Sequence, residues 1–156
     1  MCGIVGYIGN KPVYDILING LKKLEYRGYD SSGIMIYNQK ALVRKAKGKV
    51  SDLEKLFVNS ADKQGHIGIG HTRWATHGPP NEINSHPHTS NSGEITLVHN
   101  GIIENYDSIK KILTQKGYIF HSDTDSEVLV NLIEDIKKTK KVKLGKAVYY
   151  ALKQVV

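Results

Sequence analysis

Hydrophobic and polar positions divide the first part of the chain into clear elements. The run GIVGYIG, residues 3–9, is short, rich in β-branched residues and bounded by glycine, which predicts a buried strand. A helix is predicted from Pro12 to Tyr26, because apolar residues recur there at helical spacing. These residues are Ile16, Leu17, Leu21 and Leu24. Two apolar runs separated by Gln-Lys then predict a β-hairpin over residues 32–47.

A second helix and a second group of strands are expected after the hairpin. Ser51 and Glu54 in SDLE form a capping-box pattern, which predicts a helix start. HIGIGHT, residues 66–72, predicts another strand. The polar stretch at 73–93 has neither the helical nor the strand period, and connections of that length are usually binding loops or disordered segments.

The rest of the chain predicts a further mixture of strands and helices. Gly117 is a candidate helix C-cap, and Thr124 with Glu127 forms a second capping-box pattern. The expected elements are strands at 94–101 and 118–120 and helices at 105–116, 124–136 and 146–155. Because strands come in pairs with helices between the groups, we predict a layered α/β (α+β) fold with antiparallel hairpins.

Composition and charge narrow the class of protein. A chain of 156 residues has the length of one domain. No apolar run approaches the roughly 18 to 20 residues of a membrane span, so we expect a soluble protein without a membrane partner. The net charge of +7 lies at one end: residues 137–156 carry seven lysines and no acid, while residues 1–136 carry equal numbers of basic and acidic side chains. The run KKTKKVKLGK, residues 137–146, lacks interleaved aromatic residues and a recognisable nucleic-acid fold, so we predict no nucleic-acid partner.

The single cysteine of the chain is Cys2, directly after the initiator methionine. One cysteine forms no internal disulfide, and no secretory signal begins the chain, so we expect a cytoplasmic protein. If Met1 is removed, Cys2 carries a thiol with a pKa near about 8.5 and an α-amine with a pKa near about 8. The amine can then serve as general base for its own thiol. Position alone leaves open the alternative that the cysteine is incidental.

Five motifs in order give the cysteine a context. The motifs are MCGIVG, LEYRGYDSSG, HTRWATHG, HNGIIEN and SDTDSE. With them the chain resembles the glutaminase domain of the glutamine-fructose-6-phosphate aminotransferase (isomerizing) family, the glucosamine-6-phosphate synthases, among the N-terminal-nucleophile (Ntn) hydrolases. The resemblance implies an Ntn-type layered αββα fold. It also implies that residues 1–156 are a glutamine amidotransferase type 2 domain that is incomplete at its C-terminal end, with the sugar isomerase domains absent.

The resemblance implies a catalytic centre for hydrolysis of the glutamine carboxamide. Cys2 is the implied nucleophile, and Asn100 and Gly101 are the implied oxyanion hole. Attack by a thiolate puts negative charge on the carboxamide oxygen, which needs waiting N–H donors. Without the other motifs, Asn-Gly would be read as a plain turn.

The resemblance also implies a binding site for the amino-acid end of glutamine. The guanidinium of Arg73, helped by Thr76 and His77, would hold the α-carboxylate through a two-pronged contact. Asp125 would hold the α-ammonium. Trp74 either closes the site over glutamine or anchors its loop, and Arg27 is a candidate supporting residue.

Five histidines, at positions 71, 77, 86, 88 and 99, raise the question of a metal. Cys2 is the only thiol and the spacing lacks a ligand pattern, so we predict no metal, and the hydrolysis needs no cofactor. The implied partners are L-glutamine and, in a full-length enzyme, a sugar isomerase domain that binds fructose 6-phosphate, in a homodimer. Two alternatives stay open: a catalytically silent fragment that acts as a folding or interaction module, and the glutaminase half of another class II amidotransferase.

Overall fold

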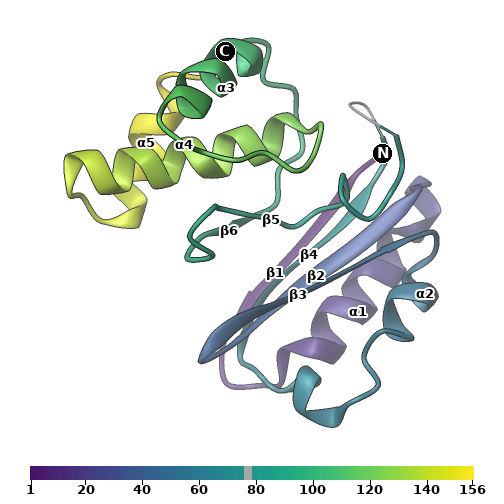
Figure 1. Cartoon of the computed structure of the whole chain (residues 1–156). Coiled ribbons are helices and arrows are strands. Elements are labelled where there is room, and N and C mark those ends of the chain that lie inside the picture. Colours follow the sequence, from purple (N-terminus) through teal and green to yellow (C-terminus); the bar gives the residue numbers. More distant parts are fainter. Residues whose placement is uncertain (76–78) are drawn as a thin grey trace.

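A four-stranded antiparallel sheet forms the centre of the first half of the molecule (Figure 1). The computed structural model describes residues 1–75 and 79–156. The strands lie in the order β1-β4-β2-β3. Their bounds are β1 Gly3–Ile8, β2 Ser31–Asn38, β3 Lys40–Lys47 and β4 Ile67–Arg73. The strand at 3–9, the hairpin at 32–47 and the strand at 66–72 are thereby confirmed, with small shifts of their ends.

Helices cover one face of this sheet and bury an apolar core against it (Figure 1). They are α1 (Val13–Leu24) and the short α2 (Val50–Glu54). Two 3₁₀ turns, η1 (Glu25–Arg27) and η2 (Ser60–Lys63), follow them. Residues 1–73 are called the N-terminal layer below. The main buried side chains of its core are Val13, Leu17, Leu21, Ile34, Ile36, Val50 and Leu53.

The second half of the molecule has an apolar core of its own. A two-stranded sheet of β5 (His88–Thr89) and β6 (Thr96–Leu97) packs against α4. Figure 1 shows this small sheet between the large sheet and the helices. Those helices are α3 (Tyr106–Gln115), α4 (Asp125–Lys140) and α5 (Leu144–Leu152). Residues 88–156 are called the C-terminal layer below. The order helix, sheet, sheet, helix confirms the expected α+β fold with antiparallel sheets.

The two predicted capping boxes differ in outcome. Thr124 is the N-cap of α4, and its hydroxyl accepts the Glu127 N–H at 3.3 Å, as expected. The Ser51 and Glu54 box is wrong, because the N-cap of α2 is Lys49. The carboxylate of Asp52 accepts the Lys49 N–H at 3.1 Å, so a nearby acid takes the role assigned to Glu54. Equivalent local hydrogen bonds are available one or two residues apart, and packing of the helix selects one of them.

Three strand expectations of the second half are wrong. Only Thr96–Leu97 of the predicted strand 94–101 is in a strand, and 118–120 is not in one. The partner β5 lies inside the polar stretch that showed no period. A strand of two residues is too short to show the alternation of apolar and polar residues by which strands are predicted from sequence.

The first strand is buried on one face only. Val5 and Tyr7 pack against the core under α1. On the opposite face Ile4 and Ile8 are 44% and 77% exposed. The expectation of a buried strand is therefore wrong for the outer face, because β1 lies at the sheet edge and α1 covers one side of it.

Candidate active site

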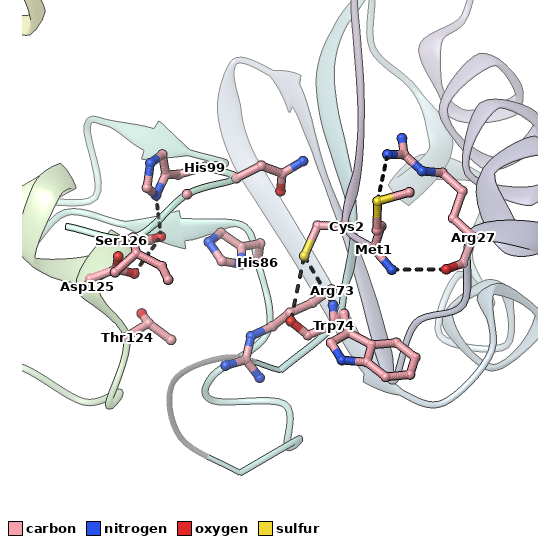
Figure 2. A pocket seen from close by; sticks show the side chains of 13 residues that line it. Met1, Cys2, Arg27, Arg73, Trp74, His86, His99, Thr124, Asp125 and Ser126 are labelled. Atoms are coloured by element: carbon pink, nitrogen blue, oxygen red, sulfur yellow. Dashed lines mark hydrogen bonds between the residues drawn. The ribbon is translucent and has the colours of Figure 1, made fainter. Parts of the chain in front are cut away.

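Strand pairing brings the N-terminal cysteine to the end of β4. Gly3 is paired with Thr72 in the antiparallel register, so the residue before β1 lies beside the residues after β4. The Cys2 Sγ accepts the backbone N–H of Trp74 at 3.2 Å. Figure 2 shows this contact, with the sulfur facing the space between the labelled side chains.

The chain terminus itself is held by the turn after α1. The Met1 ammonium donates to the carbonyl oxygens of Arg27 and Gly28, at 2.9 and 3.1 Å. Gly28 has a φ of 72°, which favours glycine, and a Cβ there would lie 3.2 Å from the Trp74 ring. Residues 25–28 therefore contact both the chain terminus and the Trp74 indole, and they leave little space between them.

Asp30 ties this turn to the loop after β4. Its carboxylate accepts the Ala75 N–H at 2.6 Å, and its own N–H donates to the Arg73 carbonyl at 2.8 Å. The side chain of Arg73 is buried, while Trp74 is 54% exposed. Asp30 thus holds the main chain on both sides of Trp74, the residue that contacts the Cys2 sulfur.

The opposite wall comes from the C-terminal layer. Asp125 begins α4, and its Oδ2 accepts the Ile103 N–H at 2.8 Å. The Ser126 hydroxyl donates to Asp125 Oδ1 and contacts Nδ1 of His99, each at 3.3 Å. Asn100 follows His99 in the bend after β6. A buried carboxylate and an exposed amide therefore face the cysteine side from separate segments.

One cavity of about 590 Å³ connects the two walls. It is lined by seven of the residues predicted from the sequence, namely Cys2, Arg27, Arg73, Trp74, Asn100, Gly101 and Asp125. The predicted Thr76 and His77 lie outside the described residues. Sequence reasoning did not assign six other lining residues to the site, namely Met1, His86, His99, Ile102, Thr124 and Ser126. Most of them neighbour a predicted residue inside the motifs, which is the signal that could have found them.

Three histidines form a buried column beside the cavity. The rings of His71 and His86 stack with centroids 4.2 Å apart, and His86 meets His88 edge-on at 4.7 Å. Burial lowers the pKa of His71 to about 4 and that of His88 to about 3. Burial also lowers the pKa of His86, and the charge of nearby Arg73 acts in the same direction. The column is therefore neutral at pH 7. Among the described residues no group of three or more His, Cys, Asp or Glu could hold a metal ion.

A half-buried lysine fixes the loop that carries this column. Lys45 of β3 donates to the carbonyl oxygens of Ile83 and Ser85, at 3.1 and 2.8 Å. Burial lowers its pKa to about 8. Gly33 of β2 lies against the same loop, where a Cβ would stand 2.1 Å from the His86 carbonyl oxygen. The loop can reach the sheet only because this position has no side chain.

The class of protein follows from comparison with known families. The chain belongs to the glutamine amidotransferase domain family, whose model matches residues 46–145. No helix within residues 1–75 and 79–156 is long and apolar enough to cross a membrane.

Particular relatives share one name. The chain is 58% identical to the glutamine–fructose-6-phosphate aminotransferase (isomerizing) of Bacteroides thetaiotaomicron, covering 100% of this chain and 26% of that protein. It is 54% identical to the enzyme of the same name from Pyrococcus horikoshii, over 86% of this chain and 23% of that protein. The chain thus spans about a quarter of the length of these relatives.

Solved structures of other amidotransferases share the fold. The glutamine phosphoribosylpyrophosphate amidotransferase from B. subtilis, complexed with ADP and GMP, matches with a TM-score of 0.80 and 27% identity. A structure titled as the allosteric regulatory enzyme of purine biosynthesis matches with a TM-score of 0.82 and 28% identity. Each match covers 99% of this chain and 33% of the solved one. The fold of this chain is therefore shared with part of each of these two solved structures.

Proposed function

We propose that this chain hydrolyses L-glutamine to glutamate and ammonia, with Cys2 as nucleophile. The observation that carries the proposal is that one cavity brings these groups together. It holds a thiol at the chain terminus, a bend with an amide side chain, a buried guanidinium and a buried carboxylate. These four groups match the four needs of glutamine: attack, oxyanion stabilisation, and a partner for each charge of the amino-acid end. Membership of the glutamine amidotransferase domain family supports the same substrate.

The nucleophile requires a processed chain terminus. Once Met1 is removed, the α-amine of Cys2 is a base within the same residue as the thiol. It takes the thiol proton as sulfur attacks the γ-carbonyl carbon of glutamine. It then gives that proton to the leaving nitrogen as the C–N bond breaks and ammonia departs. A thioester remains on Cys2, and water hydrolyses it to release glutamate.

The charge that develops during attack lies on the carboxamide oxygen. In this proposal the side-chain amide of Asn100 and the backbone N–H of Gly101 donate to it. Removing one such donor costs roughly 10²- to 10³-fold in rate in a well-studied hydrolase. The bend is held by its neighbours, since His99 contacts Ser126 at the start of α4.

Substrate selection rests on the two charged ends of glutamine. Arg73 would bind the α-carboxylate, with Thr76 and His77 as further partners, and Asp125 would bind the α-ammonium. Both Arg73 and Asp125 are at most 5% exposed, so their charges act where water screens them little. Trp74 would cover the bound substrate, and Arg27, which also lines the cavity, would be a supporting residue.

The fate of ammonia depends on the protein of which the domain is part. We propose that the chain is the glutaminase part of a glutamine-fructose-6-phosphate aminotransferase. In such an enzyme ammonia would convert fructose 6-phosphate to glucosamine 6-phosphate in a separate isomerase domain. Identities of 54 to 58% with enzymes of that name, against 27 to 28% with the purine-pathway structures, favour this choice over another amidotransferase.

A covalent probe tests the mechanism directly. The protein with Met1 removed, verified by intact mass, is treated with a diazo-ketone analogue of glutamine. We expect one adduct per chain, located on Cys2 by peptide mass spectrometry, and glutamate release from L-glutamine by the untreated protein.

Two controls define the result. Cys2→Ala should keep the thermal midpoint and lose both adduct and hydrolysis, and protein that retains Met1 should be inactive because its Cys2 has no free amine. Hydrolysis by Cys2→Ala would assign a different nucleophile. A folded, processed chain that neither hydrolyses glutamine nor is stabilised by it would be a silent fragment.

A further inference from the structure

A buried histidine contacts the amide that borders the cavity. His71 Nε2 lies 2.6 Å from Oδ1 of Asn100. His71 is in the middle of the large sheet, on β4, and its side chain is fully buried. Asn100 belongs to the bend of the C-terminal layer and is exposed toward the cavity. This hydrogen bond therefore joins a rigid strand to a residue between elements.

Hydrogen-bond chemistry determines which atom of each group donates. An amide oxygen only accepts, so the proton of this bond belongs to His71 Nε2. A neutral imidazole has one N–H, which leaves Nδ1 unprotonated. Within the described residues Nδ1 has no hydrogen-bond partner, so a proton there would be a buried donor left unpaired. The observed contact and the burial of Nδ1 both favour the Nε2–H tautomer.

The orientation of the Asn100 amide follows from this tautomer. Oδ1 of Asn100 accepts the His71 N–H, so the NH₂ group of the amide is not used by this bond. Asn100 lines the cavity, so that NH₂ group can donate to a bound substrate. A turned amide would bring its own N–H groups against the N–H of His71. The same bond that fixes the oxygen thus leaves the two amide hydrogens available for an incoming oxygen.

We infer that His71 is a positioning residue that directs the NH₂ of Asn100 toward the substrate carboxamide. The inference rests on the proposed glutaminase function, because only an oxyanion gives that direction a purpose. His71 does not touch the substrate in this account; it acts through Asn100. His86 supports it, because its ring stacks on His71 at 4.2 Å and holds the plane of the imidazole.

The first test reads the tautomer without any catalysis. Two-bond ¹H–¹⁵N NMR spectra of the whole chain should show the His71 proton on Nε2 at pH 7. The His71→Gln variant assigns the signal by its absence. A proton on Nδ1, or a doubly protonated ring at pH 7, overturns the inference whether or not the chain hydrolyses glutamine.

The second test uses glutamine hydrolysis. His71→Leu should lower kcat by about 10- to 100-fold with little change in KM, because a misdirected oxyanion donor is missed most in the transition state. His71→Gln should recover part of the loss, since its amide can present an N–H near the position of Nε2. His66→Leu is the matched control, an exposed histidine near the other end of the same strand, and should leave kcat unchanged.

A double-mutant cycle separates positioning from general structural damage. The His71→Leu change should have no further effect on kcat in an Asn100→Ala background, because the donor that it directs is already gone. An equal loss of kcat in both backgrounds would overturn the inference. If His71→Leu does not fold, the Gln variant and the wild-type NMR spectrum still decide. An inactive wild-type chain with the proton on Nε2 would refute the proposed function and leave the His71–Asn100 geometry standing.

Discussion

The two layers of this molecule contribute to the cavity in different ways. The N-terminal layer supplies Cys2 and Arg73 from positions fixed by strand pairing, at the ends of β1 and β4. The C-terminal layer supplies Asn100 from a bend and Asp125 from the first turn of a helix. Each layer has its own apolar core.

The separate apolar cores of the two layers explain where buried polar side chains can lie in this fold. Each core is completed inside its own layer, so the contact between the layers need not be apolar. Buried polar side chains lie where the layers meet, and His71 of the N-terminal layer donates to Asn100 of the C-terminal layer. Buried polar groups are costly unless they are paired, so a hydrogen bond of this kind helps to fix the geometry of the cavity.

The largest expected effect comes from opening the N-terminal core. Leu17→Ala removes a fully buried side chain of α1 and should lower the free energy of unfolding by about 2–5 kcal/mol. Ile8→Ala, on the exposed face of the same sheet, should change it by less than about 0.5 kcal/mol. Urea denaturation followed by fluorescence and by far-UV circular dichroism measures both variants.

The same experiment tests whether the layers are independent. The single tryptophan, Trp74, directly follows β4 and contacts Cys2, so it reports on the N-terminal layer. Most of the helical signal comes from α3, α4 and α5. We expect both probes to shift together in Leu17→Ala, because the polar contact couples the layers. Two separate unfolding transitions would show that each core folds alone, and they would contradict the coupling of the two layers through their polar contact.

Acid should act mainly on the contact between the layers. In the unfolded chain the imidazoles bind protons below a pH of about 6.5, whereas burial holds the pKa of His71 to about 4 and that of His88 to about 3. Between these values the unfolded state binds more protons. The free energy of unfolding should therefore fall as pH falls from about 6.5 toward 4.

Variants identify the groups behind this slope. His88→Gln should flatten the dependence of unfolding free energy on pH, and His66→Gln, at an exposed position, should leave it unchanged. Urea titrations at several pH values between 4 and 7 give the slopes. Equal slopes in all three proteins would mean that His88 binds its proton alike in the folded and unfolded states.

The smallest effect concerns one charge at the cavity. Asp125→Asn keeps an oxygen that can accept the Ile103 N–H and removes the charge proposed to bind the α-ammonium. KM for glutamine should rise by about 10- to 100-fold, the range that a hydrogen bond to a charged group contributes. Steady-state hydrolysis assays measure it. Asp123→Asn makes the same chemical change two residues away, outside the cavity lining, and should leave KM unaltered.

Local patterns predicted the N-terminal layer better than the C-terminal one. The strand at 3–9 and the hairpin at 32–47 alternate over enough residues for their type to register, and antiparallel neighbours along the chain pair directly. The strands β5 and β6 have two residues each and are formed by packing on α4. The Thr124 cap was predictable, because its hydrogen bond to Glu127 is local.

The candidate site divides in the same way. Its motifs are local, so residues such as Cys2, Asn100 and Asp125 could be singled out from the sequence. The contacts that hold them are between distant segments: Cys2 with Trp74, His71 with Asn100, and the Met1 ammonium with the turn after α1. No pattern in the chain encodes those pairs.

The amino-acid sequence by itself determined which chemical groups this protein carries and most of the elements that present them. Residue type and local spacing are sufficient for both. Only the tertiary structure decided that β1 has an exposed face and that each strand of the second sheet has two residues. It also decided that His71 forms a hydrogen bond with Asn100. Those features depend on which surfaces the fold leaves uncovered and which buried polar groups it pairs, and both are set by packing between segments far apart in the chain.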